Sequence, residues 1–429
     1  MKIIPGGNHR RKEMGGKQLQ HWILAALVFS LLMTGGLIGC RKHNDVDQLG
    51  ARDTETESIN EDGLEQSQKE LEESPAVDLI DEAMKKINEL TAAMSLEEKA
   101  GQVIMPAFRQ TAEGTLLHRL DEFTRDMLLE IQPAGVILFS ENIDHDSQVK
   151  LLIEALQAKA TVPLLVSVDE EGGRVSRLGA KGISVPRLPA AGVFGESGDV
   201  KMVYEAGLEL GKAMKMLGFN MNMAPVADVN TNPLNPVIGD RSFGSDPVEV
   251  GRMAVSMANG LMDAGIIPVL KHFPGHGDTH QDTHQGAVSL PHDQERLVSI
   301  ELIPFQRGIE AGLPVIMTAH LHVPAYDNAF PATLSPAVLT GLLRETLGFE
   351  GVIMTDALDM QAITDEWSTG EAVILALAAG ADLLLMPPEP LVARDAIVTA
   401  VTNGELPQER LDAAVERVLL LKWEAGLIN

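Results

Sequence analysis

Short apolar runs alternate with amphipathic stretches along the chain from about residue 78 onward. Eight of these runs are apolar at nearly every position rather than at every second one, and they cover 102–108, 134–139, 163–169, 221–229, 266–273, 314–320, 351–360 and 381–387. Continuous apolarity is typical of parallel strands that are buried on both faces. The pattern therefore predicts a parallel sheet covered by helices.

The stretches between the apolar runs have helical spacing. They cover 146–160, 200–218, 248–265 and 335–348, and several end in glycine, a common helix stop. A lead-in helix is predicted from Asp78 towards Leu90, and Ser95 with Glu98 predicts a capping box at the next helix. Repeated strand–helix units predict an α/β fold, a (β/α)₈ TIM barrel that forms a single catalytic domain over 78–429. A doubly wound open sheet is the main alternative, but no G-x-G-x-x-G follows the first strand.

The N-terminal 40 residues predict a secretory signal. An apolar run over 22–39 ends at Cys40 and follows the basic residues Arg10, Arg11, Lys12 and Lys17. The ending Leu37-Ile38-Gly39-Cys40 resembles a bacterial lipobox, in which the cysteine is lipidated. An uncleaved transmembrane anchor is the alternative. Either interpretation predicts an exported protein, anchored to the outer face of the cytoplasmic membrane or periplasmic.

Charge and cysteine content limit the classes of partner and the covalent links that the protein can have. Residues 41–77 are rich in Asp, Glu, Ser and Gln and predict an acidic, disordered tether. The net charge of −27, with no basic stripe, argues against a nucleic-acid partner. Cys40 is the only cysteine, so the exported body makes no disulfides. We expect a monomer that meets the membrane through its lipid anchor or N-terminal helix.

Polar residues gather at the carboxyl ends of the predicted strands. They are Asp169, Asp228, Lys271 with His272, His320 and Asp356. In a barrel these ends converge on one mouth, where active sites lie. An Asp after a strand is also a common helix cap, but five converging ends favour a site.

The segment 271–285 holds four histidines at every fourth position, a spacing that invites a zinc site on a helix. Pro274, Gly275 and Gly277 oppose such a helix, so we predict no metal and no cofactor. Asp282 lies two residues before His284 and can accept its ring N–H, which fixes the tautomer and raises the basicity of the ring.

Four motifs occur together and in order: DEEGGRVSRL, GDRSFG, KHFPGHGDTHQDTH and VIMTDALDM. In this combination the sequence resembles glycoside hydrolase family 3, and within it the bacterial β-N-acetylglucosaminidase (β-N-acetylhexosaminidase) branch. The resemblance implies a barrel domain and a retaining mechanism through a covalent glycosyl-enzyme.

The resemblance also implies roles for individual residues. The nucleophile falls on Asp356, with Asp359 as its rival, and the acid/base falls on the Asp282–His284 pair. Contacts to the sugar fall on Asp169, Arg177, Arg241, Lys271 and His272. Glu170 stands where many relatives have Gln, which is a departure from the family pattern.

The expected substrate is a glycan with terminal β-linked N-acetylglucosamine, such as a peptidoglycan fragment. Because the sequence stops at Asn429, soon after the last predicted helix, we expect no second α/β domain of the kind found in many relatives, which would favour a hexosaminidase over a β-glucosidase. The alternatives are a family 3 phosphorylase, a β-glucosidase, a zinc hydrolase and, outside enzymes, a sugar-binding lipoprotein. A retained Asp356 with Asp282 and His284 argues against the last, because binding alone needs no nucleophile.

Overall fold

The computed structural model describes residues 75–280 and 286–429. The predicted signal, lipidated Cys40 and nearly all of the predicted tether lie outside these ranges, as do Asp282 and His284. The chain divides into two compact units, Met1–Lys86 and Ile87–Asn429, with the division inside helix α3 (Pro75–Ala93). Helix α3 covers the predicted lead-in helix. Among residues 75–280 and 286–429, no helix has both the length and the apolar character needed to cross a bilayer.

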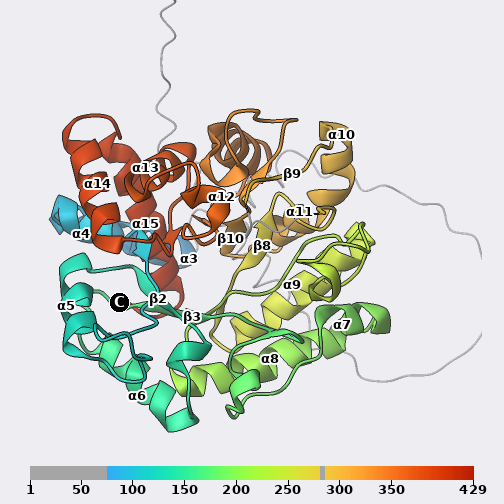
Figure 1. Ribbon diagram of the computed structural model, residues 1–429, viewed down its shortest axis with the longest axis horizontal. Coiled ribbons are helices and arrows are strands. Elements are labelled where there is room, and N and C mark those ends of the chain that lie inside the picture. Colours follow the sequence, from blue (N-terminus) through green and yellow to red (C-terminus); the bar gives the residue numbers. More distant parts are fainter. Residues whose placement is uncertain (1–74, 281–285) are drawn as a thin grey trace, which may run out of the picture. The chain divides into compact units, whose positions relative to one another are not determined.

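Every predicted strand segment of the second unit contains a strand (Figure 1). The fifth segment contains two consecutive strands, β7 and β8. The strands are β1 (Ile104–Met105), β2 (Gly135–Leu138), β3 (Leu165–Val168), β6 (Met221–Asn222), β7 (Ile267–Pro268), β8 (Leu270–Phe273), β10 (Val315–Thr318), β12 (Val352–Met354) and β13 (Leu384–Leu385).

These strands form a closed parallel ring. Ladders join β2-β3-β6-β7, β8-β10-β12 and β1-β13. The N–H of Ala134 donates to the carbonyl of Ile104 at 2.9 Å and links β1 to β2, and the N–H of Thr355 donates to Leu383 at 2.9 Å and links β12 to β13. The predicted (β/α)₈ barrel is confirmed, and the open-sheet alternative is wrong.

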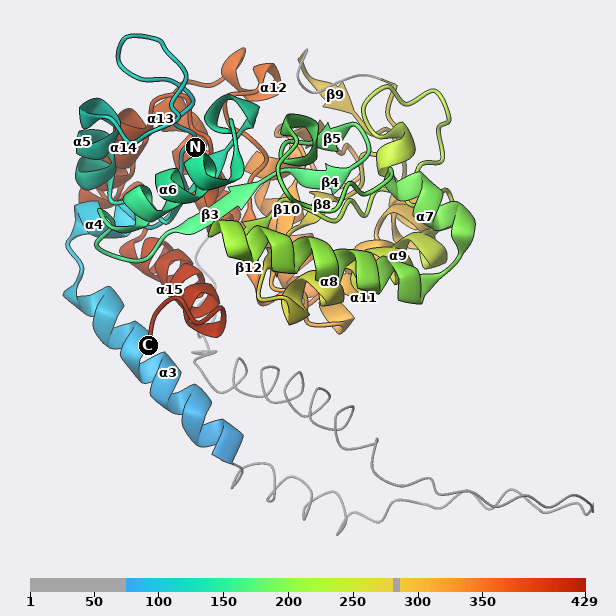
Figure 2. The same ribbon diagram turned by 90° about the horizontal axis from the view of Figure 1, so that it is seen from below.

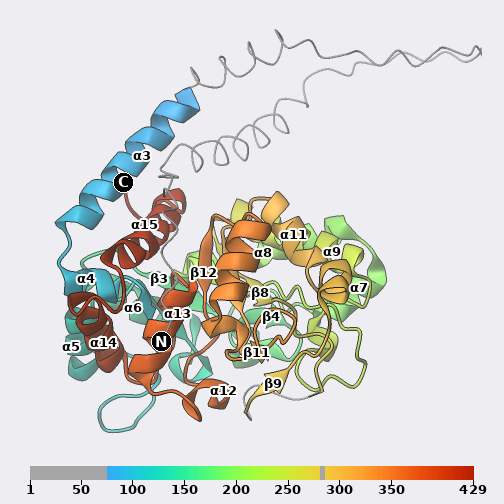
Figure 3. The ribbon, with the colours of Figure 1, turned by 90° about the horizontal axis from the view of Figure 1, so that it is seen from above.

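Helices lie outside the ring (Figures 1 and 2). Helix α8 packs against α9, and α9 packs against α11 (Figure 3). The helices are α4 (Leu96–Gly101), α5 (Glu122–Ile131), α6 (Asp146–Gln157), α7 (Ala191–Ser197), α8 (Val200–Leu217), α9 (Pro247–Asp263), α10 (Gln294–Arg296), α11 (Ile303–Glu310), α12 (Gln361–Thr364), α13 (Thr369–Ala379), α14 (Pro390–Thr402) and α15 (Gln408–Glu424).

Shorter elements complete the fold. The predicted helix over 335–348 is present as the π-helical η7 (Ala337–Thr346), and η5 (Leu297–Glu301) is also π-helical. The 3₁₀ turns are η1 (Ser140–Asn142), η2 (Gly179–Lys181), η3 (Gly239–Arg241) and η6 (Ala332–Leu334). The remaining strands form two pairs, β4 (Glu170–Gly172) with β5 (Val175–Ser176) and β9 (Val288–Ser289) with β11 (Leu321–His322).

Local sequence signals account for the helix ends. The predicted capping box is present at α4: Ser95 Oγ accepts from the N–H of Glu98 at 3.2 Å, and Glu98 Oε2 accepts from the N–H of Ser95 at 2.7 Å. Gly218 ends α8 with φ of 99°, a left-handed conformation that favours glycine.

The barrel interior is a packed apolar core rather than a channel. Its buried side chains come from strands all around the ring and include Met105, Ile137, Leu165, Met221, Val269, Met317, Met354 and Leu385. Because the barrel interior is apolar, polar side chains that could bind a ligand lie at the strand ends.

Candidate active site

Most of the polar residues predicted at strand ends lie within or just after a barrel strand, whereas Asp228 lies six residues beyond β6. Asp169 directly follows β3, and Lys271 and His272 lie within β8. His320 and Asp356 lie two residues beyond β10 and β12. Because the strands are parallel and form a ring, these ends face one mouth of the barrel.

A buried ionic network joins the carboxyl ends of β3 and β8 to the turn η3. Lys271 Nζ lies 2.7 Å from Glu171 Oε1 and 3.0 Å from Asp169 Oδ1. Arg241 donates to both oxygens of Glu171 at 2.8 Å, from Nε and from Nη2. The paired geometry of the arginine and the carboxylate fixes the position of both groups.

The charges of this network are balanced by its own members. Burial alone would raise the pKa of the Glu171 carboxyl, but Lys271 and Arg241 lower this pKa well below its usual range. Burial would likewise lower the pKa of Lys271, yet the carboxylates of Glu171 and Asp169 raise it. Both groups are therefore charged at neutral pH, and the site presents fixed donors and acceptors to a ligand.

His272 is oriented by the buried carboxylate of Asp228. Oδ2 of Asp228 accepts from His272 Nδ1 at 2.7 Å, and Oδ1 accepts from the backbone N–H of His276 at 2.6 Å. The Nε2 atom of His272 lies 3.5 Å from Arg241 Nη2. Burial would raise the pKa of Asp228, but His272 and the His276 N–H lower it. Asp228 thus fixes which ring nitrogen of His272 carries the proton.

Asp356 is partly buried and held by its own backbone turn. Its Oδ1 accepts from the N–H of Ala357 at 2.8 Å. Burial would raise the pKa of this carboxyl, but the neighbouring His320 and His272 side chains and the Ala357 N–H lower it below its usual value. Asp356 is therefore a carboxylate at neutral pH, as a nucleophile must be. Asp359, its rival, is exposed.

Two arginines share one aromatic ring at the mouth. The guanidinium of Arg109 lies 3.9 Å from the centre of the Phe139 ring, and that of Arg177 lies 5.8 Å from it. Arg177 Nη2 also lies 3.8 Å from Asp169 Oδ2. The ring of Phe139 therefore holds Arg177 beside the ionic network.

The structure thus brings together the predicted residues Asp169, Arg177, Arg241, Lys271 and His272 with Asp356. The predicted acid/base residues Asp282 and His284 lie outside the described residues, so their position stays a prediction.

Residues 95–421 match the sequence profile described as the Glycosyl hydrolase family 3 N terminal domain. The chain belongs to glycosyl hydrolase family 3.

Within family 3, named relatives share the β-hexosaminidase branch. Beta-hexosaminidase LpqI of Mycobacterium tuberculosis is 36% identical over 341 residues, which are 78% of this chain and 84% of that protein. Beta-hexosaminidase A of Pseudoalteromonas piscicida is 37% identical over 318 residues, which are 67% of this chain but only 53% of that protein. The chain therefore spans about half the length of the latter relative.

A solved structure agrees. The family 3 β-N-acetylglucosaminidase of Paenibacillus sp. str. FPU-7 superposes with a TM-score of 0.74 at 40% identity, over 78% of this chain and 63% of that chain. These comparisons confirm the predicted family and branch, the barrel and the glycoside hydrolase class.

Glu170, the departure from the family pattern, has a local structural explanation. Its Oε2 accepts from the N–H of Leu178 at 2.7 Å, and its Oε1 accepts from the hydroxyl of Ser176. Its backbone is paired with the side-chain amide of Asn222 at 3.0 and 2.9 Å. The carboxylate therefore organises the turn that carries Arg177.

Sequence reasoning missed two members of this family 3 site. Glu171 lies two positions after Asp169, an extended-chain spacing that would have marked it as sharing a face with that residue. Arg109 gave no usable signal, because its partner Phe139 follows a different strand.

Proposed function

We propose that this protein is a retaining β-N-acetylhexosaminidase that hydrolyses terminal β-linked N-acetylglucosamine from peptidoglycan fragments or related glycans. The observation that carries the proposal is the ionised Asp356 at a strand end beside a dense set of fixed hydrogen-bonding groups. A carboxylate in that place suits attack on an anomeric carbon, and the network suits recognition of sugar hydroxyls.

In the first step, an oxygen of Asp356 attacks the anomeric carbon while His284 donates a proton to the departing glycosidic oxygen. The bond to the aglycone breaks, and a covalent glycosyl-enzyme forms. In the second step, His284 takes a proton from water, whose oxygen attacks the same carbon and releases Asp356. Two inversions give net retention of the β configuration.

The Asp282–His284 pair suits this task. A histidine can give and take a proton near neutral pH, and a carboxylate on its other nitrogen fixes the tautomer. A histidine also avoids placing a second negative charge beside Asp356, which would raise the pKa of the nucleophile.

Asp169, Arg177, Arg241, Lys271 and His272 are proposed to bind the sugar. Carboxylate oxygens accept from its hydroxyls, and Lys and Arg donate to hydroxyl and N-acetyl oxygens. The ion pairs within the network fix these groups before a ligand arrives, which lowers the ordering cost of binding.

We also propose that the protein is exported and anchored through Cys40, from the basic, apolar and lipobox-like order of residues 10–40. Cys40→Ser should move the protein from the membrane fraction to the soluble fraction. An unchanged membrane association would favour the uncleaved anchor.

The function is tested by supplying aryl β-N-acetylglucosaminide and aryl β-glucoside, each with and without inorganic phosphate. The proposal expects free N-acetylglucosamine, a strong preference over glucoside and no dependence on phosphate. Release of a sugar 1-phosphate would instead identify a phosphorylase, and preference for glucoside would identify a β-glucosidase.

A further inference from the structure

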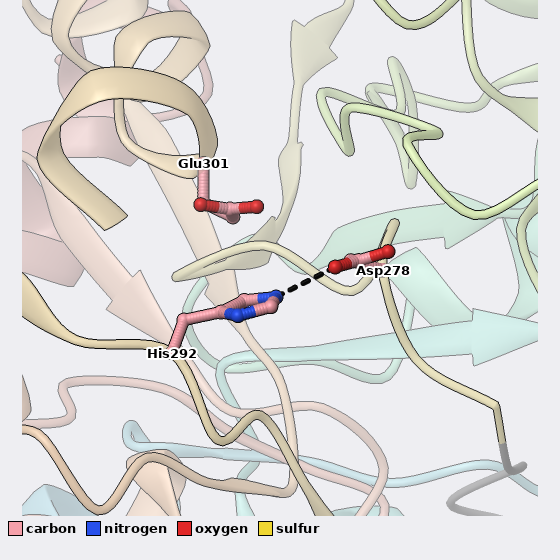
Figure 4. A group of neighbouring side chains, drawn as sticks. All are labelled: Asp278, His292 and Glu301. Carbon is pink, nitrogen blue, oxygen red and sulfur yellow. Dashed lines mark hydrogen bonds and ion pairs between the residues drawn. The ribbon is translucent and has the colours of Figure 1, made fainter. Parts of the chain in front are cut away.

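Four ionisable side chains form a cluster whose members Asp278 and His292 flank, in the sequence, the segment that carries the proposed acid/base pair. They are Asp278, His292, Arg296 and Glu301, and we name them the ionic clasp. Figure 4 shows Asp278, His292 and Glu301. None of these four residues is one of the proposed sugar-binding residues, and none is the proposed nucleophile.

The central contact joins two distant positions of the chain. Oδ2 of Asp278 lies 2.6 Å from His292 Nε2, although the residues are fourteen positions apart in the sequence. A carboxylate oxygen accepts, so the ring nitrogen donates. Asp278 lies shortly before Asp282 and His284, and His292 lies shortly after them. The contact thus fixes the separation of the two ends of this segment.

Arg296 and Glu301 hold this contact in place. Arg296 Nη2 lies 3.5 Å from Asp278 Oδ2 and 3.1 Å from Glu301 Oε1. The same nitrogen donates to Thr231 Oγ1 at 3.1 Å, which ties the cluster to the chain after β6. Glu301 is only 1% exposed, so the group at the base of the cluster is shielded from solvent.

The backbone before Asp278 lies directly against Glu301. A Cβ at Gly275 would lie 2.9 Å from the Cβ of Glu301, and Gly275 has φ of 131°. Both observations require glycine at this position. The chain that enters the segment is therefore packed onto the cluster and does not merely pass near it.

Two asparagines hold the chain on either side of Asp278 in the sequence, at His276 and Thr279. Asn232 Nδ2 donates to the carbonyl of Thr279 at 2.9 Å, and Asn235 Nδ2 donates to the carbonyl of His276 at 2.8 Å. The chain over 276–279 is thus held both by these side-chain amides and by the ionic clasp.

The cost of this arrangement suggests a role beyond stability. Glu301 is buried, and the side chains of Asp278, His292 and Arg296 are 20%, 22% and 32% exposed. Ion pairs that lose hydration are often no more stabilising than apolar side chains of similar size, whereas they impose a definite geometry. Oε2 of Glu301 accepts no hydrogen bond within the described residues, which adds to that cost. A cluster of this kind is costly as a stabiliser and well suited as a positioning device.

A metal ion is the other occupant to consider. One ligand atom from each of Asp278, His292 and Glu301 lies within 4.8 Å of the others. Arg296 already brings a positive charge to both carboxylates. The cation that the cluster needs is therefore part of the chain, which favours an ionic contact over a metal site.

We propose that the ionic clasp positions the Asp282–His284 pair for proton transfer to the departing aglycone. The proposal rests on the function proposed above. The clasp residues are positioning residues, and they act on the step in which the leaving group needs a proton.

The test compares substrates that differ only in the leaving group. Asp278→Asn and His292→Gln are made in the full chain, and kcat/KM is measured with dinitrophenyl and methylumbelliferyl β-N-acetylglucosaminides. Dinitrophenolate departs without a proton and methylumbelliferone departs less readily. We expect kcat/KM of the variants to fall about tenfold or more with the methylumbelliferyl substrate and at most a few-fold with the dinitrophenyl substrate. The reason is that general acid catalysis contributes ~10²–10⁴-fold and only the methylumbelliferyl group needs it.

The matched control is Asp412→Asn. Asp412 pairs with Lys99 at 2.8 Å between α15 and α4, and its side chain is 27% exposed against 20% for Asp278. A structural loss lowers activity on both substrates equally, so this control should leave their ratio unchanged. The double variant Asp278→Asn/His292→Gln should lose no more than either single variant, because both break the same contact.

His284→Ala, measured in parallel, separates the two proposals. If His284→Ala shows no dependence on the leaving group, the proposed acid/base role fails. If His284→Ala shows the dependence but Asp278→Asn and His292→Gln behave like Asp412→Asn, the positioning role fails. Activity of the wild type lost to a chelator and restored by zinc, but absent from Asp278→Asn with or without zinc, would overturn the ionic clasp in favour of a metal site.

Discussion

Asp228 and His272 form a buried pair in which Oδ2 of the carboxylate accepts from Nδ1 of the ring at 2.7 Å. The exposed fraction of Asp228 is zero, and its second oxygen accepts from the N–H of His276. One carboxylate thus sets the tautomer of a proposed sugar-binding residue and the path of the chain after β8.

Asp228→Asn should therefore impair both binding and stability. Both carboxylate oxygens of Asp228 accept hydrogen bonds, one from His272 Nδ1 and the other from the His276 N–H. An asparagine would place an NH₂ group at one of these positions, so one buried N–H would lose its acceptor at a cost of about 1–3 kcal/mol. We expect KM for the aryl substrate to rise about tenfold, since 1.4 kcal/mol is a factor of ten, and the melting temperature to fall. Enzyme kinetics and thermal unfolding check this. An unchanged KM would mean that the orientation of His272 does not matter for the sugar.

The same pair predicts a pH dependence of stability. The folded-state pKa of Asp228 lies below its unfolded value, so its contribution is present above the unfolded pKa and is lost as the pH falls through the folded one. Wild-type protein should lose more stability than Asp228→Asn between pH 5 and pH 3. Denaturant unfolding at both pH values measures the difference, and parallel losses would contradict it.

Lys422 also predicts a pH dependence of stability, but the cause is a buried amine and not a buried carboxylate. It is fully buried on α15, its Nζ donates to Gln102 Oε1 at 2.9 Å, and burial lowers its pKa to about 7. The unfolded chain then binds more protons between the folded pKa and the ordinary pKa of ~10.4, so stability rises with pH across that window.

Lys422→Met should abolish this rise. We expect the variant to be more stable than the wild type at pH 6, and the advantage to shrink towards pH 9 by at most about 1.4 kcal/mol per pH unit. Chemical unfolding of both proteins across pH 6 to 9 tests this. A constant difference would mean that Lys422 is charged in the fold throughout.

Replacing Arg241 by lysine should impair activity although the positive charge is kept. Its two nitrogens meet both oxygens of Glu171 at 2.8 Å, a geometry that one ammonium group cannot reproduce. Arg241→Lys should lower kcat/KM by about tenfold or more, as expected for loss of a charge-assisted hydrogen bond worth ~1.5–3 kcal/mol. Kinetics with the aryl substrate measure it, and Arg252→Lys, which changes an exposed pair with Glu249, serves as the control.

The sequence was sufficient where the determining signal is local. Eight apolar runs predicted the barrel strands, and Ser95 with Glu98 predicted a helix start, because strand burial and capping are written within a few residues. The strand ends also marked Asp169, Lys271 and Asp356, since parallel topology brings such ends together.

Contacts that join distant segments were not predictable. Arg241 pairs with Glu171, which lies seventy positions away in the sequence. Arg109, which follows β1, packs on the ring of Phe139, which follows β2. His292 and Glu301 belong to ordinary-looking sequence, and only the fold brings them to Asp278. Pairing of this kind depends on tertiary packing, which one sequence without structure does not reveal.

His284→Ala should be rescued by a small nucleophile. With a good leaving group, the glycosyl-enzyme still forms, but water lacks the base that activates it. Added azide should restore turnover and give the β-glycosyl azide, whose configuration nuclear magnetic resonance can assign. Absence of rescue together with full activity on poor leaving groups would remove the Asp282–His284 pair from the mechanism.

The identity of the nucleophile is the central claim, and trapping the covalent intermediate tests it most directly. A fluorinated N-acetylglucosaminyl analogue with a good leaving group should label the protein once, and peptide mass spectrometry should place the label on Asp356. Asp356→Ala should take no label and turn over no substrate, however good its leaving group. A label on Asp359 or on another carboxylate, or turnover by Asp356→Ala, would contradict the account.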